Sequence, residues 1–145
     1  MAKDSAAAAP EPLTLKAVEI AIRGAFARDT CSEDDLSEWH EGNPSRGHCA
    51  VTTLMIHEFF GGDLVVAPVT RNGVQFGYHW WNRLGVLDFD LTRCQFAADE
   101  RVGEPMVVDP PSDGHHYAAQ FALFRSRVLA ALEKASDTSI ECTAT

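Results

Sequence analysis

The spacing of apolar positions predicts three helices. Residues 14 to about 28 carry apolar side chains on one helical stripe, and Thr14 can cap the first turn. A second helix is predicted to begin at residue 48 or 49 and to end at the paired glycines 61–62, which supply a left-handed exit. Its apolar face is broad, so we expect this helix at the centre of the fold. A third helix is predicted over 116–135.

After residue 62 the pattern changes to one typical of strands. Residues 63–70 are apolar and β-branched, Asn72-Gly73 is a strong hairpin turn, and 74–83 is the predicted return strand. A turn at residues 84–85 leads to a third strand over 86–91. Residues 100–114 contain three prolines and predict an irregular connection. Helices, an antiparallel meander and a final helix indicate the α+β class.

Length and charge narrow the function classes. A chain of 145 residues and 15.8 kDa fits one domain, which we expect over 14–135 between a loose arm (1–13) and a polar tail (136–145). A net charge of −9 argues against nucleic-acid binding, which needs basic residues to neutralise phosphates. No apolar run reaches the roughly 18 residues of a membrane span, and the first residues lack a signal-peptide core. We therefore expect a soluble cytoplasmic protein with no nucleic-acid or membrane partner.

The four cysteines have irregular spacings. Cys31, Cys49, Cys94 and Cys142 form no C-x-x-C motif, and free thiols are expected. A zinc site built from Cys31, His40 and Cys49 would match no standard short-spaced ligand pattern. We accordingly expect neither a metal nor another cofactor.

Cys49 is the candidate nucleophile because it stands at the predicted start of the central helix. The positive end of a helix dipole favours a thiolate and lowers a cysteine pKa. A cysteine taken alone is more often a small buried apolar residue. A nucleophile also needs a base within hydrogen-bond reach and a group that orients the base.

The second hairpin supplies such a base and its partner. With two turn residues at 84–85, His79 lies directly opposite Asp90, with Cβ atoms about 5 Å apart. Asp88 shares this face by two-residue alternation and lies opposite Trp81, which could wall the pocket. A turn lengthened by two residues would place Asp88 opposite His79 instead. We take Asp90 as the predicted partner of the imidazole.

An oxyanion hole would use the backbone N–H of Cys49 and one further donor. Asn43, in the preceding loop, and the side chain of His48 are both candidates for that donor. A cysteine at a helix start, a histidine on a strand and a carboxylate opposite it form the layout of papain-like and transglutaminase-like sites.

The chain also resembles a small bacterial family labelled YunG-like. The resemblance covers about residues 15–135, and its motifs lie at Gly47–Ala50, His79–Leu84 and Asp90–Phe96. It implies a papain-like (transglutaminase-like) core, in which the helix bearing the cysteine packs on an antiparallel meander, with Cys49, His79 and Asp90 in the site. Glutamine often precedes the cysteine in that family, so His48 is a departure that bears on the second oxyanion donor.

These observations predict a cysteine-nucleophile enzyme that hydrolyses an amide or transfers an acyl group through a thioester. Its substrate is expected to be a small molecule or a short isopeptide, since the chain is too short for a deep two-lobed polypeptide cleft. Two alternatives remain open at this point: a non-catalytic small-molecule-binding module on the same fold, and an acyltransferase in which an amine resolves the thioester.

Overall fold

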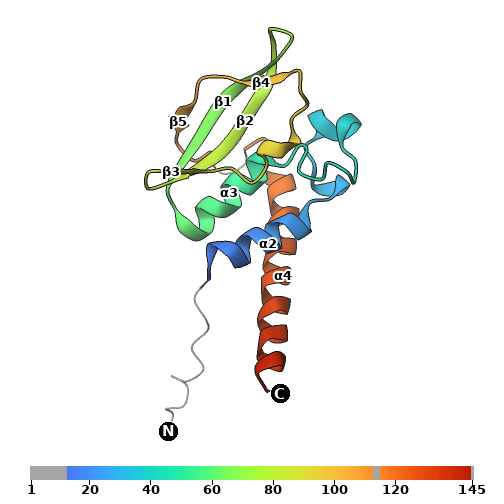
Figure 1. Ribbon diagram of the computed structural model, residues 1–145, viewed down its shortest axis with the longest axis vertical. Helices are drawn as coiled ribbons and strands as arrows, with labels where there is room; N and C mark the ends of the chain where they lie inside the picture. The colour runs from blue at the N-terminus through green and yellow to red at the C-terminus, as the bar shows by residue number, and fades with distance from the viewer. Residues whose placement is uncertain (1–12, 113–114, 145) are drawn as a thin grey trace.

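The computed structural model describes residues 13–112 and 115–144, with side chains as far as residue 136. An antiparallel sheet lies against helix α3, and helices α2 and α4 pack on the other side of α3 (Figure 1). The helices are α2 (Leu15–Ala25), α3 (Cys49–Phe60) and α4 (Ala118–Ala144), and the 3-10 turns are η1 (Arg28–Thr30), η2 (Glu33–Glu38) and η3 (Arg93–Gln95). The strands are β1 (Asp63–Arg71), β2 (Val74–Leu84), β3 (Leu87–Phe89), β4 (Glu100–Val102) and β5 (Met106–Val108).

The first two helices begin where local chemistry predicts. The hydroxyl of Thr14 accepts a hydrogen bond from the backbone N–H of Ala17 at 3.1 Å, so the predicted cap is confirmed. Helix α2 is shorter than predicted, because Phe26 is already extended and the chain continues in η1. Helix α3 begins at Cys49 and ends against Gly61, whose φ of 70° is the left-handed exit expected of a glycine.

The sheet extends the predicted meander. β1 and β2 form the hairpin around Asn72-Gly73, and β3 follows β2. The predicted irregular connection over 100–114 is wrong in two places, because β4 and β5 each pair with β1 on its other side. Strands of three residues are too short to show alternation in the sequence.

The predicted pairing of β2 with β3 is wrong by two residues: each β2 residue pairs with a β3 residue two positions later in the chain than predicted. Leu84 pairs with Leu87, so the turn residues are Gly85 and Val86 rather than 84 and 85, and Asn82 pairs with Phe89. An even shift leaves every side chain on its predicted face, because side chains alternate with a period of two. β3 ends at Phe89, so the strand predicted to reach residue 91 is shorter.

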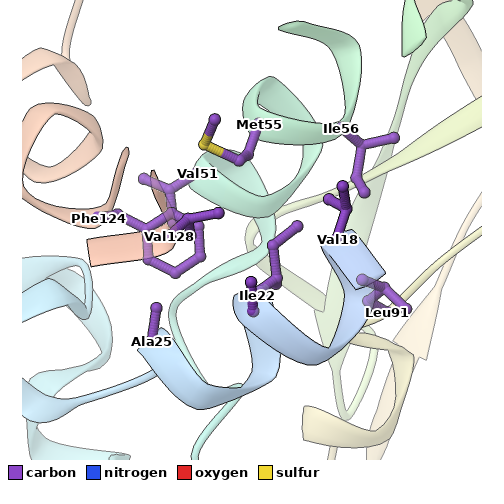
Figure 2. Close-up of a cluster of buried hydrophobic side chains, with 10 residues drawn as sticks. Val18, Ile22, Ala25, Val51, Met55, Ile56, Leu91, Phe124 and Val128 are labelled. Atoms are coloured by element: carbon purple, nitrogen blue, oxygen red, sulfur yellow. The ribbon is translucent and has the colours of Figure 1, made fainter. Parts of the chain in front are cut away.

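The main core lies among the three helices. Val18 and Ile22 of α2, Met55 of α3 and Phe124 of α4 are all inaccessible to solvent and belong to one cluster (Figure 2). A second cluster lies on the sheet, where Trp81 packs with Val65 and Ala67. Trp81 is 5% exposed, whereas its neighbour Trp80 is only partly buried.

The two ends of the expected domain differ from the prediction. α4 continues to Ala144, so the segment from residue 136 expected as a tail is helical. Helix propensity is local and continues while no proline or glycine intervenes, and none follows residue 135. The expected arm lies outside the described residues except for Leu13. Across the described part of the chain, no helix has both the length and the apolar character needed to cross a bilayer.

Candidate active site

A buried arginine anchors the loop that leads into Cys49. Arg46 is 4% exposed, and its Nη1 lies 2.8 and 3.0 Å from the two carboxylate oxygens of Glu100. Its other nitrogens reach Asp35 at 2.9 Å and Glu38 at 2.7 Å. A buried charge is costly unless it is paired, and the carboxylates that pair Arg46 come from η2 and β4, so the network holds the loop against both.

Both backbone polar groups of Gly47 form hydrogen bonds with side chains. Its N–H donates to Oε1 of Gln95 at 3.2 Å, and its carbonyl accepts from Nε2 of Gln120 at 3.1 Å. Its φ is +76°, and a Cβ here would collide with the Sγ of Cys31. Only glycine fits this position, and the contacts from η3 and α4 set the direction in which the chain enters α3.

His48 is a core residue, which corrects the expectation that its side chain donates to an oxyanion. Its ring is 0% exposed and packs against Phe26 and Phe124. Nδ1 must donate to the carbonyl of Arg46 at 2.9 Å, because a carbonyl only accepts, so Nε2 accepts from the Thr30 hydroxyl at 2.7 Å. Burial lowers the pKa of His48 from 6.5 to about 4. The ring is therefore neutral at pH 7, and both nitrogens are occupied.

Cys49 stands at the first position of α3, beside the part of the β2 edge that β3 does not cover. Its Sγ lies 3.9 Å from the carbonyl oxygen of Tyr78. Burial raises the pKa of Cys49 to about 12, and the charges of Asp35 and Asp90 add to the rise. The backbone N–H groups of Trp80 and Ala50 act in the opposite direction. The predicted low pKa is therefore wrong in this structure, because desolvation outweighs the helix dipole.

His79 and Asp90 form the predicted contact. Nε2 of His79 lies 2.7 Å from Oδ2 of Asp90. The same oxygen accepts from Nε of Arg93 at 2.7 Å, and Oδ1 accepts from the backbone N–H of Thr92 at 3.2 Å. Burial alone would raise the pKa of Asp90, yet these partners, with His79 foremost, hold it below its usual value. Asp90 is thus ionised and oriented toward the imidazole, although the strand register differs from the one that predicted it.

The second nitrogen of His79 is buried and has no partner. The ring is 0% exposed, and Nδ1 forms no hydrogen bond with any described residue, Cys49 included. An ionised carboxylate accepts the proton of Nε2, so in the neutral ring Nδ1 carries the lone pair. Phe96 packs edge-on against this ring at 4.8 Å between centroids. The structure therefore holds the imidazole in the tautomer whose basic nitrogen is Nδ1.

His79 is part of β2, whereas Cys49 contacts this strand from α3. On the face toward the helices, Asn82 donates to the carbonyl of Thr53 in α3, and Trp80 packs against Tyr117. Alternation places His79 on the other face. Cys49 reaches the strand at its backbone edge, so the sulfur and the ring are neighbours along β2 without a direct hydrogen bond.

Three other predicted site residues lie away from the thiol. The side-chain amide of Asn43 donates to the carbonyl of Gln95 at 2.8 Å, which corrects its expected role as an oxyanion donor. Trp81 stacks on the ring of His79 and donates from Nε1 to Asp88 at 3.1 Å, so it belongs to the second core cluster rather than to a pocket wall. Asp88 also pairs with Arg83, and it does not reach the imidazole.

A cleft of about 220 Å³ opens beside Cys49. Sequence reasoning missed two of its walls, Phe96 and Tyr117, because nothing in the local pattern shows that they approach residue 49. Gln95 was also missed as the residue that holds Gly47, although it lies within the motif at 90–96 that carries the family resemblance. Among the described residues, no group of three or more His, Cys, Asp or Glu side chains is placed to hold a metal ion.

Comparison with known proteins identifies relatives but no activity. The model of a family described as YunG protein matches residues 14–133. The chain is 32% identical over 71 residues to a protein of Bacillus subtilis strain 168 named "Uncharacterized protein YunG". That alignment covers 49% of this chain and 57% of the relative, which is less than two thirds of the relative's length. No solved structure matches the chain.

Proposed function

We propose that this chain, which belongs to the YunG protein family, is a cysteine-nucleophile enzyme that hydrolyses an amide or transfers an acyl group through a thioester at Cys49. The proposed substrate is a small molecule or a short isopeptide that enters the cleft beside the thiol. The proposed fold relationship is to the papain-like and transglutaminase-like cysteine enzymes.

One observation carries the proposal. His79 is bonded through Nε2 to an ionised Asp90 and keeps Nδ1 unbonded on the strand segment that Cys49 touches. An unpartnered buried nitrogen costs free energy, and such costs concentrate at functional sites. A histidine oriented by a carboxylate and left with a free basic nitrogen is the arrangement that general-base catalysis requires.

The proposed reaction runs in two steps. Nδ1 of His79 accepts the thiol proton of Cys49 while Sγ attacks the substrate carbonyl carbon, and the carbonyl π pair moves to oxygen. The imidazolium then protonates the leaving amine as the C–N bond breaks, which leaves the thioester. Water or an amine resolves the thioester, with His79 again as base. Asp90 stabilises the imidazolium, and the uncapped N–H groups at the start of α3 favour the oxyanion.

Closure around the substrate must bring the thiol and the imidazole together. Phe96 contacts the ring of His79 and also lines the cleft beside Cys49. A change in the Phe96 rotamer on substrate entry would open a path between sulfur and nitrogen. Catalytic hydrogen bonds commonly tighten only when substrate is present.

A non-catalytic binding module is the second candidate. The raised pKa of Cys49 and the missing hydrogen bond to His79 favour it, because both describe a thiol that is not activated at rest. A module of this kind would bind its ligand reversibly in the same cleft, and it would still bind the ligand after replacement of Cys49 by alanine.

Acylation by an activated ester, p-nitrophenyl acetate, separates the two. Intact mass after acid quench, followed by peptide mapping, should show one acetyl group on Cys49, and Cys49→Ser should lose it. His79→Ala should slow acylation by about 10²-fold or more, the usual contribution of a general base. The matched control is His40→Ala, since that ring is exposed and lies in the loop before the site. Acetylation of Cys94 alone, or equal rates in the two histidine variants, would exclude the proposed enzyme.

A further inference from the structure

The walls of the cleft beside Cys49 carry more negative than positive charge. Of the described residues that line it, three are acidic and one is basic. The acidic residues are Asp34, Asp35 and Glu38, and the basic residue is Arg46. The excess of carboxylates makes the cleft a site of negative potential, and a low-dielectric wall strengthens such a potential.

Arg46, the one basic residue among the described residues that line the cleft, is already neutralised by carboxylates. Arg46 is 4% exposed, and its Nη1 contacts both carboxylate oxygens of Glu100, which is itself buried. Asp35 and Glu38 complete its shell. An anionic substrate group would therefore find no free guanidinium in the cleft, and this excludes carboxylate or phosphate recognition by Arg46.

Asp34 is the carboxylate left for a ligand. It is exposed in η2, lines the cleft, and forms neither an ion pair nor a hydrogen bond with any described residue. Asp35, by contrast, is held by Arg46 and by the Ser32 hydroxyl at 3.0 Å. This unpaired carboxylate thus lines the same cleft as the thiol of Cys49.

Aromatic rings supply the rest of the surface. Tyr78 and Phe76 of β2, Phe96 and Tyr117 all line the cleft, and Tyr78 is 57% exposed. The face of an aromatic ring attracts cations, most strongly where water is partly excluded. Rings combined with an unpaired carboxylate form a surface suited to an ammonium or guanidinium group.

We propose that the cleft accepts a substrate bearing a positively charged amine or guanidinium, with Asp34 as its counter-ion and the aromatic walls around its stem. This rests on the proposed function, in which Cys49 attacks a carbonyl of the same substrate. A bound cation would also offset the negative charges that disfavour the thiolate at Cys49. Substrate binding would then activate a thiol that is kept protonated at rest.

Two thiol reagents of opposite charge test this without requiring turnover. The trimethylammonium-ethyl and sulfonato-ethyl methanethiosulfonates each form an S–S bond to cysteine and expel methanesulfinate, while the thiol proton passes to solvent. Peptide mapping gives the rate at Cys49 and, in the same sample, at exposed Cys94. We expect the cation-to-anion rate ratio at Cys49 to exceed the ratio at Cys94 roughly tenfold at low salt.

Asp34→Asn should lower that ratio roughly threefold or more, and Asp63→Asn is the matched control, because it removes the same charge from the exposed far end of β1. Equal ratios at the two cysteines, or equal effects of the two variants, would overturn the cationic substrate. Charge preference at Cys49 without ester acylation would keep the cationic ligand and exclude the enzyme. Acylation without charge preference would keep the enzyme and exclude this substrate class.

Discussion

The buried imidazole of His48 should make the protein less stable in mild acid. The pKa of this ring is 6.5 when unfolded and about 4 in the folded chain, chiefly because of burial. Between these values the unfolded state binds about one proton more than the folded state, so stability rises with pH. The contribution is therefore present in full above about pH 6.5 and is lost as the pH falls toward 4. At roughly 1.4 kcal/mol per pH unit, the loss is about 3 kcal/mol.

The measurement is urea unfolding followed by tryptophan fluorescence, between about pH 7 and about pH 4.5. Asp90 and Glu100 also have lowered pKa values, but they lose their partners at more acid pH than this window. His48→Gln keeps polar atoms near Thr30 and removes the titrating ring, so its stability should fall about 2 kcal/mol less than that of the natural protein over this range. His40→Gln, at an exposed position, should follow the natural protein.

Parallel curves for His48→Gln and the natural protein would refute the reasoning. They would mean that the ring titrates alike in the folded and unfolded chains, and hence that it is reached by water. In that case the ring could still turn toward Cys49, and the predicted oxyanion role of His48 would return.

Three further experiments have definite expected outcomes. Gly62→Ala should lower the free energy of unfolding by about 3 kcal/mol in the same urea assay, since φ is +81° and the new Cβ would lie 2.6 Å from a β2 carbonyl oxygen. Gly61→Ala, at a φ of +70° but in open space, should cost about 1 kcal/mol in that assay. Phe124→Ala should cost about 3–5 kcal/mol in that assay because the ring is fully buried among three helices. Under the proposed function, Asp90→Asn should slow acetylation of Cys49 by about 10²-fold or more, because it would hold His79 in the wrong tautomer. Asp88→Asn should change the rate less than about twofold. A larger loss of rate in Asp88→Asn than in Asp90→Asn would remove Asp90 from the site.

The partnership of His79 and Asp90 shows how a prediction can hold when one of its steps fails. The turn lies one residue later than expected, so the strand ladder does not place the two residues opposite each other. The contact forms because the chain leaves the ladder after Phe89, and Arg93 and the Thr92 amide orient the carboxylate. The sequence was sufficient to predict which face of the strand each side chain lies on. It was not sufficient to predict the path of the chain after Phe89, which brings Asp90 to His79.

The amino-acid sequence alone determined the features that depend on neighbours in the chain. Helical spacing, the Thr14 cap, the glycine exit at 61–62 and the Asn72-Gly73 turn are local, so α2, α3 and the first hairpin were predictable. They placed Cys49 at a helix start and His79 on a strand. Only the tertiary structure decided the protonation of these groups, because a pKa depends on burial and on charges that arrive from distant segments. Cys49 is a protonated thiol, His48 is a neutral core ring, and the acidic cleft has walls from η2, β2 and the loops around residues 96 and 117. Desolvation is a property of the packed molecule, and no local pattern in the chain encodes it.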